Sequence, residues 1–316
     1  MKKYHVKDDD RLIYSDGFSI VEEGRSSIKK FSVSGVLPDL FSLVKRILRT
    51  DIHSIKICND YLVVILKGKL RFYRRHEVVK EFTIGRGSRP LRNGVVCLNN
   101  QLFYGDYWSN PEKLDVNIYR IDVKTLEREI FYSFKHVRHI HFLQEDLFLD
   151  NSLLIGTGDS DSESGLFQLN IKTKKLEIIL EGSQDTRVVS VIQHKEYLIW
   201  GTDAPNVENY IYKYNRKTKE LNRLIEIDGP AYYSTITKKG YMYIATTVEN
   251  RHKHNAIIYE SKDYGNNWTE YKKFKKDIWH SKYFGYGIIE FIEGQESSDK
   301  LFFNKIGLSE LKERLK

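Results

Sequence analysis

A short hydrophobic run recurs along this chain at an almost constant interval, and it restricts the fold more than any other feature. The run ends on an aromatic residue 45 to 48 residues after the previous one, at Tyr73, Tyr119, Phe167, Tyr212 and Tyr259. A second apolar run precedes each of these, with its second residue at Leu62, Leu102, Leu153, Leu198 and Met242. Because the two runs keep the same order over five intervals, the sequence predicts five copies of one structural unit.

Each unit contains four short segments rich in β-branched and aromatic residues, which predict four strands. In the fifth unit they span 232–237, 241–246, 256–261 and 268–274. Three units open the turn between the third and fourth strands with Asp122, Asn170 or Asn215, each followed by a Lys-Thr pair. Side chains of this type accept a hydrogen bond from the backbone two residues on. Four antiparallel strands in every 45 or so residues indicate the blades of a β-propeller.

The number of units predicts an all-β, six-bladed β-propeller that occupies residues 1–316 as a single domain; five or seven blades are the alternatives. The five clear blades lie near 53–85, 89–134, 136–183, 186–228 and 229–277. We expect strands near both ends, at 12–15, 19–22, 28–33, 286–292 and 300–306, to complete the sixth blade together. Amphipathic patterns predict short capping helices near 39–49 and 309–315.

Composition excludes several classes of protein. A hydrophobic content of 41% with 13% aromatic residues is too high for a disordered chain. No apolar run approaches the roughly 18 residues of a membrane span, and the first residues lack the apolar stretch of a signal peptide, so we expect a cytoplasmic protein. Cys58 and Cys97 are expected to form neither a disulfide framework nor a zinc site. The net charge of +8 favours an anionic partner.

One turn carries a recognisable motif. The stretch from Ser261 to Trp268 reads Ser-Lys-Asp-Tyr-Gly-Asn-Asn-Trp and matches the Asp-box pattern Ser-x-Asp-x-Gly-x-x-Trp. There, Asp263 can hold the turn backbone, Gly265 can adopt a left-handed conformation, and Trp268 can pack between sheets. The chain thus resembles the Asp-box (BNR-repeat) propellers, which include sialidases. In that family the motif is structural, so the resemblance implies a propeller more firmly than a glycan substrate.

Candidate functional residues follow from the order of the strands. In a meander of antiparallel strands, the start of each first strand and the end of each second strand lie on the same face, where propellers bind ligands. The ends of the second strands contribute Tyr104, Asp106, Tyr107, Asp159, Asp203 and Glu249. The starts of the first strands contribute Arg89, Arg92, Arg138, His139, His141, Arg187 and Tyr232, and Glu163 follows Asp159 in its loop. This face therefore concentrates arginine, histidine, tyrosine and carboxylates.

A second resemblance covers roughly residues 89–250. The segments 138–141, 156–163 and 182–187 look like a family of Asp-box-related propellers associated with polysaccharide gene clusters. That resemblance implies which positions matter and names no reaction.

These residues predict a propeller that cleaves an anionic polysaccharide or oligosaccharide, as a glycoside hydrolase or a polysaccharide lyase. Arginines 89, 138 and 187 suit a uronate or sialate carboxylate, because a guanidinium matches a carboxylate bidentately. Hydrolysis would use two carboxylates from Asp106, Asp159, Glu163 and Asp203. Elimination would use His139 or His141 with Tyr232 or Tyr233 as base and acid. The predicted catalytic set is His139, His141, Asp159, Glu163 and Tyr232, and the other residues on the face are predicted to bind substrate.

Other interpretations stay open. His139 and His141, with Asp159 or Glu163, can hold a divalent cation. The protein can instead be a non-catalytic propeller that binds a glycan or another protein, since a fold does not imply a function. The plain structural alternative is that the acids form turns and pair with the arginines. Nucleic acid is disfavoured as a partner, because the basic clusters at 71–75 and 272–276 are typical of solvated strand ends.

Overall fold

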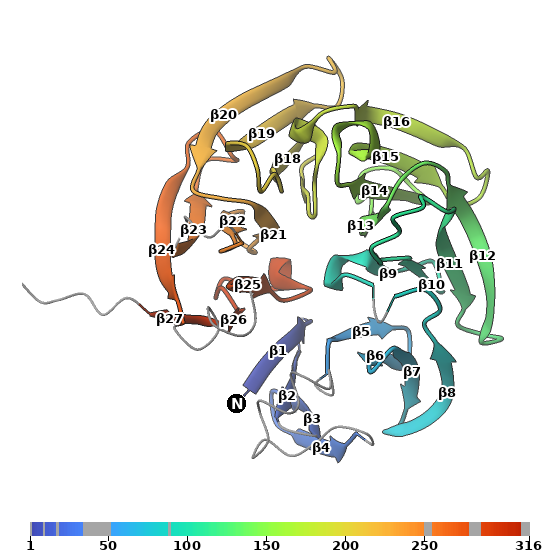
Figure 1. The fold of residues 1–316 in the computed structure, drawn as a ribbon. Helices are drawn as coiled ribbons and strands as arrows, with labels where there is room; N and C mark the ends of the chain where they lie inside the picture. The colour runs from blue at the N-terminus through green and yellow to red at the C-terminus, as the bar shows by residue number, and fades with distance from the viewer. Residues whose placement is uncertain are drawn as a thin grey trace, which may run out of the picture. The chain divides into compact units, whose positions relative to one another are not determined.

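The strands follow one another along the chain as antiparallel meanders. The computed structural model describes residues 2–8, 10–16, 19–33, 52–87, 90–249, 255–277 and 286–310. Six sheets in this part of the chain contain four consecutive strands, each paired with its sequence neighbour (Figure 1). One of the six gains a fifth strand, and a further sheet has two strands. We call each four-stranded sheet a blade, and the fold class is the six-bladed β-propeller.

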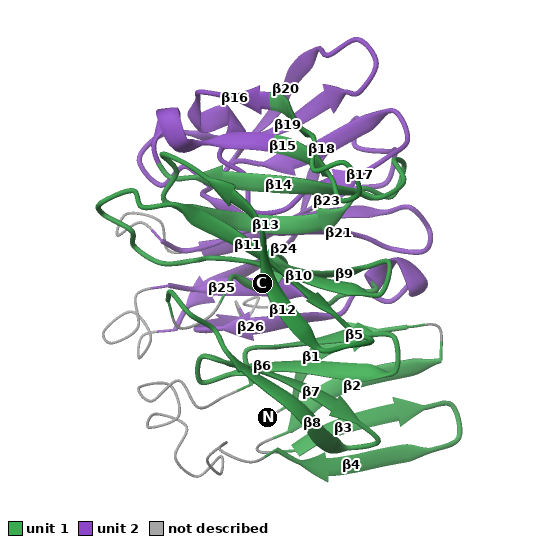
Figure 2. Ribbon diagram, turned by 90° about the vertical axis from the view of Figure 1, so that its right-hand side faces the viewer, with its two compact units in different colours: residues 1–159, 167–179, 292–294 green, residues 160–166, 180–291, 295–316 purple. Residues whose placement is uncertain are grey.

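The chain divides into two compact units, coloured separately in Figure 2. Unit 1 comprises residues 1–159, 167–179 and 292–294, and unit 2 comprises residues 160–166, 180–291 and 295–316. Each unit is described by itself below.

Three blades lie entirely in unit 1, and a fourth lies mostly in it. The first contains β1 (Lys2–Lys7), β2 (Arg11–Asp16), β3 (Ser19–Gly24) and β4 (Ile28–Ser32). The second contains β5 (Ser54–Cys58), β6 (Tyr61–Leu66), β7 (Lys69–Arg74) and β8 (Glu77–Thr83). The third contains β9 (Val95–Leu98), β10 (Gln101–Gly105), β11 (Val116–Asp122) and β12 (Glu127–Phe134). The fourth contains β13 (His139–Glu145), β14 (Ser152–Gly158), β15 (Gly165–Asn170) and β16 (Leu176–Glu181).

Unit 2 contains the remaining two blades and the small sheet. One blade contains β17 (Ile192–Gln193), β18 (Tyr197–Gly201), β19 (Asn209–Asn215) and β20 (Leu221–Ile227). The other contains β21 (Ala231–Ile236), β22 (Met242–Thr246), β23 (Asn255–Ser261) and β24 (Thr269–Lys276), extended by β27 (Leu308–Glu310). The two-stranded sheet pairs β25 (Ile288–Phe291) with β26 (Phe303–Ile306). Short 3₁₀ turns are η2 (Arg92–Gly94) in unit 1, and η3 (Asp161–Glu163), η4 (Gln184–Thr186) and η5 (Gln295–Ser297) in unit 2.

The five central blades agree with the predicted repeat, and the prediction of a six-bladed fold is confirmed. The predicted make-up of the sixth blade is wrong, because the N-terminal strands form a complete blade of their own. The sequence did not predict its first strand, β1. The lysines of this segment make it look polar, although His5 and Val6 are buried. A parallel bridge between Val6 and Glu293 links β1 to the later segment within unit 1.

The two predicted capping helices fare differently. The segment 39–49 lies outside the described residues. In the segment 309–315, the helix prediction is wrong for residues 309 and 310, which belong to β27 and pair with β24. Residues 311–315 again lie outside the described part of the chain.

Apolar side chains of neighbouring strands bury one another in the blades, and the inner strands β6 and β14 are buried almost throughout. In unit 1, Phe103, Ile118 and Ile155 belong to a core cluster in which each is completely buried. In unit 2, Ile199 and Ile244 form the equivalent cluster with Trp268 of the Asp-box motif. This burial holds each blade rigid enough to position polar residues at the strand ends.

The turns between third and fourth strands form as predicted. The side-chain oxygens of Asp122, Asn170 and Asn215 each accept hydrogen bonds from the backbone N–H groups two and three residues on. In the Asp-box turn, Asp263 Oδ1 accepts the N–H groups of residues 266 and 267, and Gly265 has a φ of 78°. The conformational role assigned to each motif residue is therefore correct.

The cysteine prediction is wrong. Cys58 at the end of β5 and Cys97 in β9 form a disulfide, with 5.6 Å between their Cα atoms. The bond joins the second and third blades of unit 1, whose strands the sequence alone does not place side by side.

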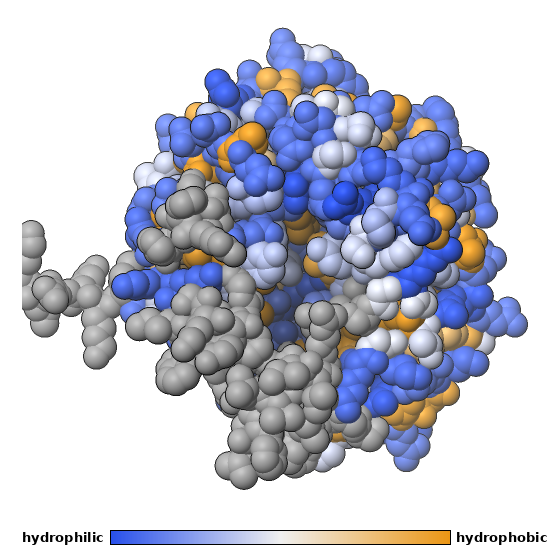
Figure 3. Space-filling view, in the orientation of Figure 1, coloured by the Kyte–Doolittle hydropathy of each residue, from blue (hydrophilic) through white to orange (hydrophobic). Residues whose placement is uncertain are grey.

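Polar side chains dominate the coloured part of the face shown in Figure 3. Hydrophilic residues cover most of the face seen in Figure 3, and hydrophobic ones are scattered among them. Within the described ranges, no helix is both long and apolar enough to cross a membrane.

Candidate metal centre

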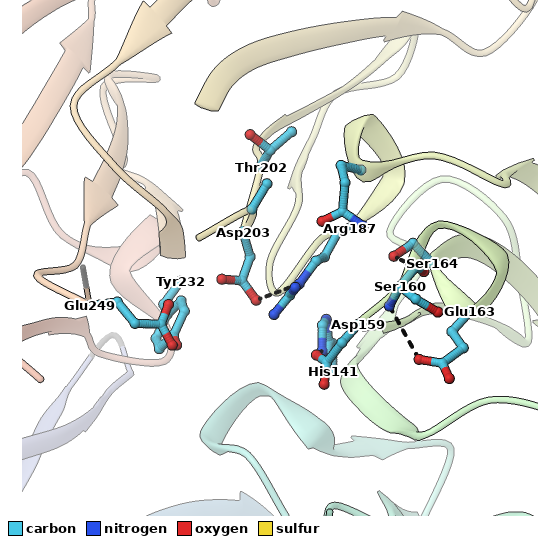
Figure 4. A network of polar contacts seen from close by, with 12 residues as sticks. His141, Asp159, Ser160, Glu163, Ser164, Arg187, Thr202, Asp203, Tyr232 and Glu249 are labelled. Carbon is cyan, nitrogen blue, oxygen red and sulfur yellow. Dashed lines mark hydrogen bonds and ion pairs between the residues drawn. The ribbon is translucent and has the colours of Figure 1, made fainter. Parts of the chain in front are cut away.

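Three potential metal ligands meet where β13 begins and β14 ends, in unit 1. His139 and His141 are two residues apart on β13, and Asp159 directly follows β14, its antiparallel partner. The ladder between β13 and β14 shifts register between Ile140 and Phe142, and both imidazoles face the carboxylate. The cluster was among those predicted from the sequence, and Figure 4 shows His141 against Asp159.

The three ligand atoms form a nearly equilateral triangle. The Nε2 atoms of His139 and His141 are 3.0 Å apart, and each lies 3.3 Å from Asp159 Oδ1. A tetrahedral ion with bonds of roughly 2.1 Å would hold its ligand atoms about 3.4 Å from one another. The triangle therefore has the size that a single small divalent cation requires.

A backbone carbonyl orients the first histidine. His139 Nδ1 lies 3.0 Å from the carbonyl oxygen of Trp108. Since a carbonyl can only accept a hydrogen bond, Nδ1 carries the proton, and the lone pair on Nε2 is directed toward His141 and Asp159. Such an arrangement is common for histidines that bind a metal through Nε2, because the second hydrogen bond fixes the tautomer and the ring orientation.

Close packing fixes the second histidine. The side chain of His141 is buried, and a Cβ placed on Gly158 would lie 2.3 Å from its Cε1 atom. Any side chain at position 158 would therefore displace the imidazole. The ring of Tyr107 packs against His139 at a centroid distance of 4.4 Å. The site is thus built from buried, constrained groups with one more open ligand, Asp159.

Charge favours a cation at this point. Burial alone would raise the pKa of Asp159, but the hydrogen bonds that His139 and His141 donate when their Nε2 atoms carry protons outweigh burial and hold that pKa well below its usual range. The carboxylate is therefore ionised over the physiological range. Its second oxygen, Oδ2, lies 3.5 Å from Nη1 of Arg138, whose side chain is 39% exposed. Arg138 can thus contact a bound anion beside the cluster.

Two further pairs of predicted residues meet in unit 2. Arg187 Nε lies 3.4 Å from Asp203 Oδ2, with both side chains largely buried. The hydroxyl of Tyr232 donates a hydrogen bond of 2.9 Å to Glu249 Oε1. Figure 4 shows that the members of each pair point toward one another. Arg187 and Asp203 pair with each other, which is the structural alternative that the sequence left open for these residues. Tyr232 and Glu249 remain candidates for acid–base chemistry.

Four predicted site residues have structural positions instead. Tyr104 is completely buried in the core, where its hydroxyl accepts a hydrogen bond from Arg128 and burial raises its pKa to about 12. Asp106 is buried and accepts the N–H of Asn117, and burial raises its pKa. Neither suits contact with a substrate.

Glu163 and Arg92 are corrected in the same way. Glu163 belongs to the capping box of η3, in which its side chain accepts the N–H of Ser160 at 3.2 Å. Arg92 is buried and donates to the carbonyl oxygen of His5 at 3.0 Å, which holds β1 in place. Arg89 lies outside the described residues. The sequence placed these residues at the correct strand ends but did not reveal which backbone groups would bind them.

Two contributors to the site were missed. Trp108 contributes its backbone carbonyl oxygen, and because every residue has one, the sequence could not point to it. Gly158 had a weak signal, because it directly precedes an acidic residue at a strand end.

Comparison with known proteins supports the fold. No family model and no curated protein matches the chain. Among solved structures, the chain is similar to an oligogalacturonate lyase in complex with manganese, with 11% identity, a TM-score of 0.56, and coverage of 84% of this chain and 75% of that one. It is also similar to the extracellular domain of a protein described as a hybrid two-component system of B. thetaiotaomicron, with 13% identity and a TM-score of 0.56. That match covers 92% of this chain, which spans 35% of the length of the other.

Fold and comparisons together define a class of protein. The chain is a six-bladed β-propeller with a potential metal-binding cluster of two histidines and one aspartate. Of the two structural neighbours that support this fold, one is named an oligogalacturonate lyase and the other an extracellular domain.

Proposed function

We propose that the chain is a metal-dependent, carbohydrate-active propeller that cleaves an anionic saccharide by elimination. The observation that carries this proposal is the triangle of His139, His141 and Asp159, whose ligand atoms match the spacing around one ion. Support also comes from the manganese named with the structurally similar lyase. The Asp-box turn is in keeping with a relation to carbohydrate-active propellers.

Each residue of the cluster has a definite task under this proposal. Both histidines bind the ion through Nε2, so neither serves as the general base, and the acid–base role predicted for them is replaced by metal binding. Arg138 contacts the substrate carboxylate, to which a guanidinium binds bidentately. A bound divalent cation supplies Lewis acidity at that carboxylate.

Elimination fits a carboxylate held in this way. The proton on the carbon next to the carboxylate passes to a general base, and the bond from the neighbouring carbon to the glycosidic oxygen breaks. The departing oxygen takes up a proton, and the new chain end carries a carbon–carbon double bond. Positive charge beside the carboxylate stabilises the negative charge that develops on it in the transition state.

Metal binding is the first test. The protein stripped with a chelator is titrated calorimetrically with Mn²⁺ and with Zn²⁺, and we expect one site per chain. His141→Ala removes one of three ligands and should abolish measurable binding. His136→Asn is the matched control, because His136 is exposed in the same unit and asparagine tolerates its φ of 62°. Binding that survives His141→Ala, or none in the unaltered protein, would overturn the proposed site.

Turnover is the second test. The metal-loaded protein is incubated with oligogalacturonate, and the ultraviolet absorbance of the unsaturated product is followed. We expect absorbance to grow only with metal present and to be lost in Arg138→Ala. New reducing ends without absorbance would show hydrolysis instead. If anionic oligosaccharides of several types are not cleaved, the proposed reaction is wrong.

A second candidate function is a binding module without catalysis. The similarity to an extracellular domain of a hybrid two-component system favours it. Saturable, metal-dependent binding of the same oligosaccharides with no change in their length would establish this function in place of the first.

A further inference from the structure

A separate cavity lies between the first and second blades of unit 1. Its volume is about 370 Å³, which falls within the range of small-molecule sites. It opens where β2 and β6 begin and where β5 and β7 end. The candidate metal centre instead lies at the start of a first strand and the end of a second. The cavity therefore occupies the opposite strand ends and shares no residue with that centre.

The acidic groups of the cavity are already neutralised. Glu22 lies between two cationic or titratable groups, with Arg11 Nη1 at 3.4 Å from one oxygen and His76 Nε2 at 3.3 Å from the other. Asp60 pairs with Arg74 at 2.8 Å. Neither carboxylate is left to attract a cation from solution.

Two cations of the cavity lack such partners. Lys29 on β4 and Arg75 in the turn between β7 and β8 both line it. Lys29 pairs with Glu22 through the strand ladder, but neither cationic side chain makes a hydrogen bond or an ion pair with a residue in the described ranges. Arg75 and His76 both have positive φ values, 50° and 72°, as in a type I′ hairpin turn. The turn thus fixes the backbone from which Arg75 extends.

The lining of the cavity also includes aromatic side chains. Tyr61 and Tyr73 line the cavity. Phe31 stacks on His76 with ring centroids 4.6 Å apart and lies 5.6 Å from the ring of Tyr73. Small ligand sites commonly combine flat apolar surface of this kind with a few charged groups that fix orientation.

We propose that this cavity binds a small phosphomonoester built on a ring, with its dianionic group held by Lys29 and Arg75. The two positive charges match the charge of a phosphomonoester, for which lysine and arginine are the usual ligands. Tyr61, the less buried of the two tyrosines, contacts the ring. This site is independent of the proposed elimination reaction.

Calorimetric titration of the full chain tests the proposal and separates two sources of the same chemistry. The probes are glucose 6-phosphate for a sugar phosphate and adenosine monophosphate for a nucleotide. Saturable binding of either one supports the site and identifies the source. Binding of neither overturns the proposal, and so does binding of unphosphorylated glucose or adenosine with equal affinity.

Variants locate the binding. Lys29→Gln and Arg75→Asn should each weaken it at least about tenfold, because each removes a charge-assisted hydrogen bond. Asparagine accepts the positive φ at position 75, so the turn is kept. Lys30→Gln is the matched control, since Lys30 neighbours Lys29 but points to the other side of β4. An equal loss in the control, or no loss in the two variants, would place the ligand elsewhere.

Discussion

Gly158 shows how a single residue without a side chain positions a metal ligand. Its absent Cβ leaves the space that the His141 ring occupies. We expect Gly158→Ala to displace that ring and to weaken Mn²⁺ binding about 10- to 100-fold, as loss of supporting groups does at other metal sites. Gly85→Ala is the control, because a Cβ there would meet its nearest neighbour at an ordinary 3.9 Å. Equal affinity in the two variants would show that the ring position is unimportant.

His5 predicts how stability depends on pH. Its side chain is completely buried, and burial, followed by the nearby charges of Lys3 and Arg92, lowers its pKa well below 6.5. As the pH falls below about 6.5, the unfolded chain binds a proton at this position that the folded chain refuses, so the free energy of unfolding decreases.

His5→Gln removes this contribution to the pH dependence. Urea unfolding at about pH 7.5 and about pH 5.5 should show a smaller loss of stability between the two values in the variant than in the unaltered protein. The quantity to compare is the change in stability between the two pH values, because the other histidines are present in both proteins. An unchanged difference would mean that His5 does not contribute.

Among the elements, the Asp-box turn between β23 and β24 is held by several hydrogen bonds to the Asp263 side chain. Hydrogen bonds from the backbone and side chain of Asn267 lower the pKa of Asp263 to about 2. Asp263→Ala should reduce the free energy of unfolding by about 1 kcal/mol, because several solvent-exposed donors lose a charged acceptor. In the unaltered protein the same contribution is present above about pH 4 and is lost as the pH falls toward 2.

Chemical unfolding near neutral pH measures the effect. Glu208→Ala provides the control, since it also removes one acidic charge from unit 2, at an exposed position outside the turn. If the two variants lose the same amount of stability, the turn has no special role.

The elements also show what sequence could and could not predict. Regular spacing between aromatic and apolar runs gave five blades with nearly correct limits, because strands such as β6 and β14 are buried almost throughout and are therefore apolar in every copy of the repeat. The first strand, β1, was not predicted, because Lys2, Lys3 and Lys7 outnumber the two buried residues of this segment. In the candidate site, strand order brought His139, His141 and Asp159 together. Predictions for Asp106 and Glu163 were unsuccessful because backbone groups, which sequence does not reveal, bind their carboxylates.

For the molecule as a whole, the disulfide between Cys58 and Cys97 closes a loop with a sequence separation of 39. A loop of this length predicts about 4 kcal/mol of stabilisation through the unfolded chain. Replacing both cysteines by alanine should lower the free energy of unfolding by roughly this amount, and reduction of the unaltered protein should do the same. Urea unfolding with and without reductant checks both. No effect of reductant on the unaltered protein would contradict the prediction.

Because of this bond, the properties of a protein sample depend on the redox conditions under which it was produced. Disulfides persist in oxidising surroundings and are rare where glutathione keeps thiols reduced. Protein folded in a reducing cytosol would therefore carry two thiols at the junction of its second and third blades, and protein exported to an oxidising compartment would carry a covalent link. Two samples with the same sequence and the same strands would then withstand heat, denaturant and proteases to different degrees.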